Sequence, residues 1–234
     1  LMRALDKIEA KAKKIAAHLM EAGDADIEFA NGEFSVKGTD KKIPFGSVAL
    51  TAYVPHNYPI EELEPGLEET AFYDPKNFTY PGGCHIAEVE IDPDTGEVAI
   101  PLYVSSNDAG RVVNPLIVEG QVVGGALQGI GQALCEAVIY DPATGQPLTA
   151  SFMDYTMPRA DMLPTATTLL DQSIPCRTNP LGVKGVGELG TIGATPCVVN
   201  AVADAFARNG RGPQASKIQM PMTPFRLWEQ LQGL

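Results

Sequence analysis

The segment from Pro115 to Leu134 places the strictest demand on the fold of this chain. Its apolar residues recur at helical spacing, yet it contains five glycines: Gly120, Gly124, Gly125, Gly129 and Gly131. Each glycine inside a helix costs about 1 kcal/mol relative to alanine, so the set costs about 5 kcal/mol. A close contact between this backbone and a neighbouring group is the simplest compensation. The segment therefore predicts a helix that another group approaches closely.

Amide side chains follow one face of this predicted helix. Gln121, Gly125, Gln128 and Gln132 succeed one another at spacings of four, three and four residues, which places them on one side. An amide-lined stripe with a glycine gap suits a polar, hydrogen-bonding ligand. The same pattern also suits tight helix–helix packing with satisfied glutamines, because small residues at such spacing commonly serve packing. Both interpretations stay open at this level.

A second glycine-rich stretch runs from residue 182 to 196 and reads GVKGVGELGTIGATP. Its five glycines surround a single carboxylate, that of Glu188. Such a run indicates unusual backbone dihedrals or a close approach of another group to the main chain. An acid held there with one side unobstructed could act as a general base beside a bound cofactor. Glu188 could equally be an exposed loop acid or a carboxylate held by glycine amides.

Residues 185–190 of this stretch match the GxGxxG pattern of nicotinamide-binding folds. No hydrophobic strand precedes them, and the next helix is expected to open with Thr195 as its N-cap and Pro196 at its first position. Asp204, the acid about twenty residues on, falls within that helix, which disfavours a dinucleotide-binding fold. The loop amides and the helix amino terminus at Thr195 instead predict an anion cradle.

The remaining pattern alternates helices with hairpin-linked strands in blocks, which favours an α+β class with hairpin-rich sheets packed with helices. A loop rich in proline and glutamate at 57–66 suggests subdomains 1–66 and 67–234. Helices are predicted at 2–22, 45–53, 115–134, from Thr195 to Asn209, and 223–232. Strands are predicted at 27–29, 34–36, 71–73, 85–91, 97–105, 137–140 and 147–150.

Charge and cysteine content exclude several function classes. The net charge of −12 argues against nucleic-acid binding, which needs clustered lysine and arginine. The four cysteines and three histidines lack metal-ligand spacing, so no metal site is expected and a reducing cytoplasm fits best. No uninterrupted apolar stretch reaches the length of a membrane span, so none is expected. A start within a helical pattern, with no signal peptide, is typical of a piece of a longer subunit.

Three stretches, taken together and in order, resemble the molybdenum hydroxylases, the superfamily of xanthine dehydrogenase and aldehyde oxidase. They are DAGRVVNPLIVEGQ at 108–121, SFMDY at 151–155, and GVKGVGELGTIGA at 182–194 followed by VVNAV at 198–202. The first two are most similar to the large subunit of carbon monoxide dehydrogenases. The resemblance covers nearly the whole chain. It implies that residues 1–234 form the C-terminal part of the molybdopterin-binding domain, about the last third of such a subunit.

The resemblance also implies the chemistry. Glu188 falls where the family has an active-site glutamate, which takes the proton from a Mo–OH as that oxygen attacks the substrate carbon and hydride passes to a Mo=S sulfur. The implied cofactor is molybdenum–molybdopterin, usually as the cytosine dinucleotide in bacterial members. The isolated chain is expected to be inactive and need not retain the cofactor.

Cofactor contacts are implied at matching positions. Gln121 falls where a glutamine contacts the pterin, and Gln128 lies on the same amide stripe. Gly185, Val186 and Gly187 fall on main chain that passes the cofactor.

The implied partners are the remainder of the molybdenum subunit, a 2Fe–2S subunit and a flavin (FAD) subunit, with a small-molecule substrate. Two alternatives remain: a non-catalytic cofactor-binding or assembly module of the same fold, and a nicotinamide dehydrogenase. The family's copper-linked cysteine lies in a loop outside this sequence, so none of the four cysteines is assigned to copper.

Overall fold

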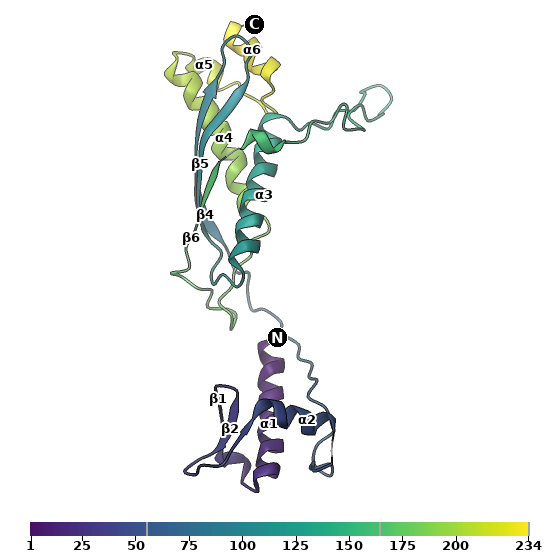
Figure 1. Cartoon of the computed structure of the whole chain (residues 1–234). Coiled ribbons are helices and arrows are strands. Elements are labelled where there is room, and N and C mark those ends of the chain that lie inside the picture. The colour runs from purple at the N-terminus through teal and green to yellow at the C-terminus, as the bar shows by residue number, and fades with distance from the viewer. Residues whose placement is uncertain (55, 164, 234) are drawn as a thin grey trace. The chain divides into compact units, whose positions relative to one another are not determined.

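Residues 1–54, 56–163 and 165–233 are described by the computed structural model (Figure 1). The chain divides into two units, Leu1–Lys76 and Asn77–Leu234. This division lies beyond the expected subdomain boundary at residue 66. The reason is that the segment after the proline-rich loop bonds back to the first helix. Arg3 donates to the carbonyl of Phe72 at 3.0 Å, and Lys7 donates to the carbonyl of Thr70 at 2.7 Å.

The first unit packs two helices on a small antiparallel sheet. Helix α1 (Met2–Met20) and helix α2 (Phe45–Tyr53) cover strands β1 (Ile27–Ala30), β2 (Glu33–Val36) and β3 (Lys42–Pro44), and a 3₁₀ turn (η1, Asp24–Asp26) precedes β1. The predicted strands at 27–29 and 34–36 are confirmed, and Asn31 and Gly32 form the hairpin turn between them. Both residues have positive φ, 51° and 80°, as a type I′ hairpin turn requires. Phe34 is fully buried at the centre of this unit's core.

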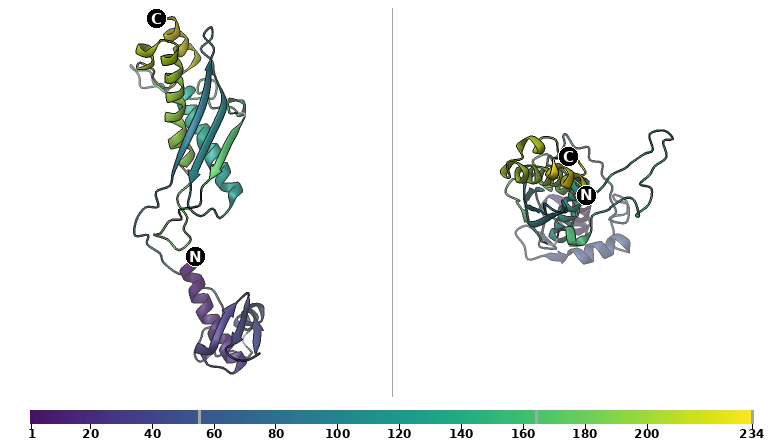
Figure 2. Two further views of the ribbon diagram at one scale, coloured as in Figure 1. Left: turned by 90° about the vertical axis from the view of Figure 1, so that its left-hand side faces the viewer. Right: turned by 90° about the horizontal axis from the view of Figure 1, so that it is seen from above.

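The second unit is a two-layer arrangement of helices on a sheet. Strand β5 (Val98–Asp108) pairs antiparallel with β4 (Gly82–Ile91) and parallel with β6 (Ala166–Leu170). Helices α3 (Pro115–Leu134) and α4 (Leu189–Arg208) lie on the same side of this sheet (Figure 2). The core between them includes Tyr103 from β5, Ile130 from α3, and Val198 and Phe206 from α4.

Shorter elements complete this unit. They are a 3₁₀ turn (η2, Ala160–Met162), α5 (Gly212–Ala215) and α6 (Pro224–Gln232). The predicted bounds of α3 are confirmed, with Asn114 as N-cap accepting from the amide of Ile117. The predicted last helix is confirmed as well, capped by Thr223.

Several predicted strands are wrong or incomplete. Residues 71–73 form no strand, and 137–140 and 147–150 form an isolated bridge between Tyr140 and Pro147 in place of two strands. Strands β3 and β6 were not predicted from the sequence. The parallel pairing of β6 depends on a partner more than fifty residues earlier in the chain, which no local pattern reveals.

The predicted start of the helix after the glycine loop is also wrong. Helix α4 begins at Leu189, so Pro196 lies inside it and Thr195 is not its N-cap. Proline inside a helix removes one backbone hydrogen bond, and close packing against α3, described below, compensates. The predicted end at Asn209 and Gly210 is confirmed. Within the described residues, α4 is the one helix whose length and hydropathy would allow a membrane span; here it packs on α3 and β4.

Candidate functional site

Helices α3 and α4 approach so closely that glycine is required between them. A Cβ on Gly190 would overlap the carbonyl oxygen of Val122 and lie 2.7 Å from the amide nitrogen of Ala126. A Cβ on Gly129 would lie 2.8 Å from the carbonyl oxygen of Thr191. These distances are shorter than van der Waals contact. The close approach inferred from the glycines of α3 is therefore present, and α4 is the neighbour that makes it.

Two threonines of α4 hydrogen-bond across this contact. The Thr191 hydroxyl donates to the carbonyl of Gly125 at 2.7 Å, and Oε1 of Gln128 lies 3.1 Å from the same hydroxyl. One turn later, Thr195 repeats the arrangement with Gly129 at 3.1 Å and Gln132 at 3.2 Å. Sequence reasoning missed the role of these threonines. Their spacing of four matches the spacing of the two glycines opposite, and that was the available signal.

Helix packing accounts for only part of the glycine pattern. Gly120 and Gly124 in α3, and Gly185 and Gly187 in the loop before α4, would meet nothing within 4 Å among the described residues if each carried a Cβ. None of the four has positive φ. Neither backbone conformation nor contact within this chain therefore requires glycine at these positions. They leave bare main chain exposed.

The register of the two helices brings the open glycines to one end of the unit. The contacts of Val122 with Gly190, and of Gly129 with Thr191, show that α3 and α4 run parallel side by side. Gln121 lies one helical turn before Gly125, level with the loop that precedes α4. Gln121 is exposed and has no hydrogen-bond partner within the part of the chain that is described. We call the surface formed by 117–128 and 185–192 the glycine face.

Glu188 is the N-cap residue of α4, and its side chain is exposed. It makes no side-chain capping hydrogen bond, so its carboxylate is not used to complete the helix. The helix amino terminus carries partial positive charge, which favours a carboxylate there. The anion cradle expected at Thr195 is thus misplaced, because the amino terminus of the helix lies at Glu188 and Leu189.

This helix start also changes the comparison with a dinucleotide-binding loop. The helix does begin inside the GxGxxG match, between Gly187 and Gly190. A dinucleotide-binding fold still requires a strand directly before the glycines, and residues 171–184 contain only an isolated bridge at Val183.

A short ladder ties the glycine loop to the end of β5. The amide of Arg111 donates to the carbonyl of Gly182, and the amide of Lys184 donates to the carbonyl of Ala109, both at 2.9 Å. Gly182 has φ of 71°, so it is the one residue of 182–196 that needs the left-handed backbone. The unusual dihedrals expected from this stretch are therefore limited to its first glycine.

An ion pair reinforces this connection. Nζ of Lys184 lies 2.5 Å from Oδ2 of Asp108, and their side chains are 10% and 27% exposed. The other carboxylate oxygen of Asp108 accepts from the amide of Gly110 at 2.9 Å. Close by, a hydrogen bond with Thr178 lowers the pKa of the Cys176 thiol, and the charge of Lys184 contributes. The pair joins the stretch that begins at Asp108 to the loop that leads to Glu188.

Changing Lys184 to methionine should therefore destabilise the second unit by about 2 kcal/mol, because Asp108 would keep a mostly buried carboxylate without its partner. Urea unfolding of the chain measures this. Arg208→Met is the matched control: Arg208 pairs with Asp204 at 2.6 Å in the same unit, but its side chain is 80% exposed. The control should change stability by less than about 0.5 kcal/mol. Equal effects of the two changes would contradict the structural role of Lys184.

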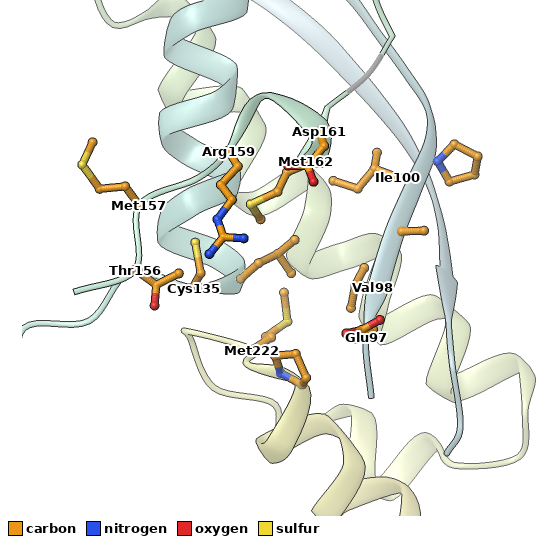
Figure 3. Close-up of a pocket in the computed structure, with 14 residues that line it drawn as sticks. Glu97, Val98, Ile100, Cys135, Thr156, Met157, Arg159, Asp161, Met162 and Met222 are labelled. Carbon is orange, nitrogen blue, oxygen red and sulfur yellow. The ribbon is translucent and has the colours of Figure 1, made fainter. Parts of the chain in front are cut away.

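A cavity of the second unit lies away from the glycine face. A pocket of about 580 Å³ opens between the start of β5, the end of α3 and the segments 156–162 and 222–224 (Figure 3). Arg159 points into it beside Cys135 and Met222. None of the residues predicted for the site lines this pocket. Among the described residues no group of three or more His, Cys, Asp or Glu side chains could hold a metal ion. Gly185, Gly187 and Glu188 of the glycine face are exposed.

Comparisons with known proteins identify the relatives of this chain. The family described as the molybdopterin cofactor-binding domain matches residues 1–164. The chain is 41% identical to the carbon monoxide dehydrogenase large chain of Afipia carboxidovorans, over 95% of this chain and 27% of that protein. It is 38% identical to the 6-hydroxypseudooxynicotine dehydrogenase complex subunit gamma of Paenarthrobacter nicotinovorans, over 96% of this chain and 27% of that protein.

Solved structures agree with these relatives. A crystal structure of Cu,Mo-CO dehydrogenase superposes with a TM-score of 0.86 at 39% identity, covering 97% of this chain and 28% of that chain. Quinoline 2-oxidoreductase from Pseudomonas putida 86 gives 0.83 at 36% identity, covering 98% and 29%. The expected α+β fold is therefore confirmed. The chain spans just over a quarter of the length of these relatives.

Proposed function

Because this chain belongs to the molybdenum hydroxylases, as a molybdopterin-binding part of a carbon monoxide dehydrogenase-like large subunit, we propose that its glycine face binds the cofactor and that Glu188 acts there as the base. The observation that carries the proposal is the uncovered main chain at Gly185 and Gly187, beside an exposed carboxylate at a helix amino terminus. Nothing within the described chain accounts for those glycines, whereas a flat cofactor lying against bare backbone would.

The residues present fit a molybdopterin. Its pterin edge carries donors and acceptors that pair with an amide, which Gln121 offers one turn beyond the helix contact. Its phosphate groups are anions, and the positive amino terminus of α4 suits anions. Gln128 shares its Oε1 with Thr191, so its contribution to the cofactor would come from its amide nitrogen. Val186 is half-buried against the cluster of Val122 and Leu189, which anchors the loop between the two open glycines.

In the proposed reaction the bound cofactor supplies oxygen transfer to the substrate and accepts its electrons. The chain supplies the rest. Glu188 accepts a proton at a carboxylate oxygen, and its position before α4 places the residue on the glycine face. The ion pair of Lys184 with Asp108 fixes the loop on which Glu188 stands. Water exclusion requires a cover over this face, which the rest of the subunit would provide.

The finer assignments are also part of the proposal. They are the cytosine dinucleotide form of the cofactor, 2Fe–2S and flavin partner subunits that carry electrons away, a small-molecule substrate, and a cytoplasmic location. They follow from the family resemblance. The two curated relatives above are named as a large chain and as a subunit of a complex, which agrees with a multi-subunit enzyme.

The intact complex should contain bound molybdenum, release a cytidine nucleotide on acid treatment, and give a Mo(V) electron paramagnetic resonance signal that changes when substrate is added. Metal analysis, chromatography of the released nucleotide and low-temperature spectroscopy check these points. Bound molybdenum whose Mo(V) signal does not change with any substrate would favour the non-catalytic assembly module. Absence of molybdenum, together with binding of NAD(H) in a titration, would favour a nicotinamide dehydrogenase instead.

A further inference from the structure

We propose that residues 137–157, which we call the arm, are a docking element that packs against an apolar surface in the remainder of the large subunit. The arm leaves the second unit at the end of α3 and returns just before η2, projecting away from the helices and sheet (Figure 1). The inference rests on the proposed function in one respect: it requires that this chain works as part of a longer subunit. Its evidence is separate.

The arm is fastened at its base. The amides of Cys135 and Glu136 both donate to the carbonyl of Gly131, at 2.9 and 2.8 Å. The Tyr155 hydroxyl donates to the Glu136 carboxylate, and this hydrogen bond raises the pKa of Tyr155. A Cβ on Gly131 would overlap Glu136 and lie 2.9 Å from the ring of Pro158, so the two ends of the arm meet over this glycine. The base of the arm is therefore fixed to the end of α3.

The arm is also organised internally. The amide of Leu148 donates to the carbonyl of Ile139, and the amide of Asp141 donates to the carbonyl of Gln146, both at 2.8 Å. The Asp141 carboxylate accepts from Thr144 through both its amide and its hydroxyl, which lowers the pKa of this carboxyl group. Order of this kind before binding reduces the entropy that docking must overcome.

The arm presents apolar side chains to the outside. Phe152 is 82% and Met153 is 92% exposed. The set of large exposed apolar residues on the arm comprises Val138, Ile139, Tyr140, Leu148, Phe152, Met153 and Met157. A two-stranded hairpin is only marginally stable in water without a surface to pack on, and exposed large apolar side chains in this number indicate an interaction site.

The charges of the arm indicate the chemistry of its partner. The segment contains no lysine, arginine or histidine. Its two carboxylates are both used within the arm: Asp141 in the turn, and Asp154 as acceptor of the Ser151 hydroxyl at 3.1 Å. The arm therefore offers no cation to a partner, and its large exposed side chains are apolar. The matching surface is therefore apolar, as in permanent interfaces rather than transient ones.

The position of the arm indicates which polypeptide provides that surface. A cavity of about 230 Å³ lies between the glutamine stripe and the arm, lined by Gln128, Gln132, Val138 and Tyr155 among others. Whatever covers the glycine face thus also meets the base of the arm. The relatives carry nearly three quarters of their length outside the region matched here. A surface in the same polypeptide also acts at high effective concentration.

Photo-crosslinking in the purified complex tests the proposal. Benzoylphenylalanine replaces Phe152 in the intact large subunit, and irradiated samples are digested and analysed by mass spectrometry. The expected adducts join the arm to peptides of the same large subunit outside residues 1–234. Benzoylphenylalanine at Phe225 is the control, because that ring stacks on Trp228 at 6.3 Å between centroids and should give adducts within α6.

Each other outcome overturns the proposal. Adducts with a smaller subunit, or with an isotope-labelled second copy of the large subunit, would assign the arm to an interface between polypeptides. No adduct at position 152, with the control adduct present, would show that the arm stays in solvent. Molybdenum is measured in the same samples, so the docking role of the arm and the proposed function are tested separately. Adducts without molybdenum would contradict only the proposed function, and molybdenum without adducts only the docking role.

Discussion

Glu188→Gln in the intact complex should lower turnover by roughly 10²–10⁴-fold, the usual contribution of general base catalysis. Glutamine keeps the shape of the side chain but cannot accept the proton. Because Glu188 is exposed and makes no capping hydrogen bond, the change removes no packing and no cap. Stability, molybdenum content and substrate binding should therefore stay near their original values. Steady-state kinetics measures turnover and substrate binding, and metal analysis of the same preparation measures the molybdenum content.

Asp204→Asn is the matched control for this variant. Asp204 also lies on α4 and is exposed, but it pairs with Arg208 far from the glycine loop. Its turnover should be close to that of the original enzyme. A second readout is the pH profile, since loss of a base removes the dependence of turnover on its ionisation. Activity of Glu188→Gln within a few-fold of the original would disprove the assignment of the base.

Gly190→Val should destabilise the second unit by about 3 kcal/mol or more, because new carbon atoms would be forced into the contact between α3 and α4. The first of them would overlap the carbonyl oxygen of Val122 and crowd the amide of Ala126. Both are backbone atoms, so the helices must separate, which would also loosen the hydrogen bond of Thr191 to Gly125. Urea unfolding followed by circular dichroism measures the loss.

Gly187→Ala tests whether this glycine serves cofactor binding and not the packing of the helices. A Cβ at Gly187 would meet nothing within 4 Å of the described chain, and its φ is not positive. The stability of the chain should therefore change by less than about 0.5 kcal/mol. In the intact complex, however, the same methyl group would enter the space proposed for the cofactor and should reduce bound molybdenum. Equal stability losses for Gly187→Ala and Gly190→Val would contradict this division of the glycines.

Local signals predicted the elements that depend only on neighbouring residues. The hairpin that joins 27–29 to 34–36 and the helices at 115–134 and 223–232 all appear where the sequence places them. Each works through hydrogen bonds or φ angles within a few residues. Motif resemblance extended this to the fold and the family, which the relatives and the solved structures confirm.

The errors concern features that depend on distant contacts. Thr195 and Pro196 form a good helix start by local rules, yet α4 runs through them. The hydroxyl of Thr195 donates a hydrogen bond to the carbonyl of Gly129 instead of capping the helix. Strand β6 becomes a strand only through its parallel pairing with β5. The roles of Gly185 and Gly187, of Gln121 and of Glu188 stay predictions, because they point to a group outside this chain.

The sequence by itself determined the class of this protein and the residues worth testing, because glycine spacing, caps and motif order are properties of short segments. Only the tertiary structure decided which glycines serve the α3–α4 contact and which lie open. That distinction depends on what stands opposite each backbone atom. Gly129 and Gly187 are the same type of residue, and the sequence alone does not distinguish their roles. One faces the main chain of a neighbouring helix, and the other faces a space that the described chain leaves empty.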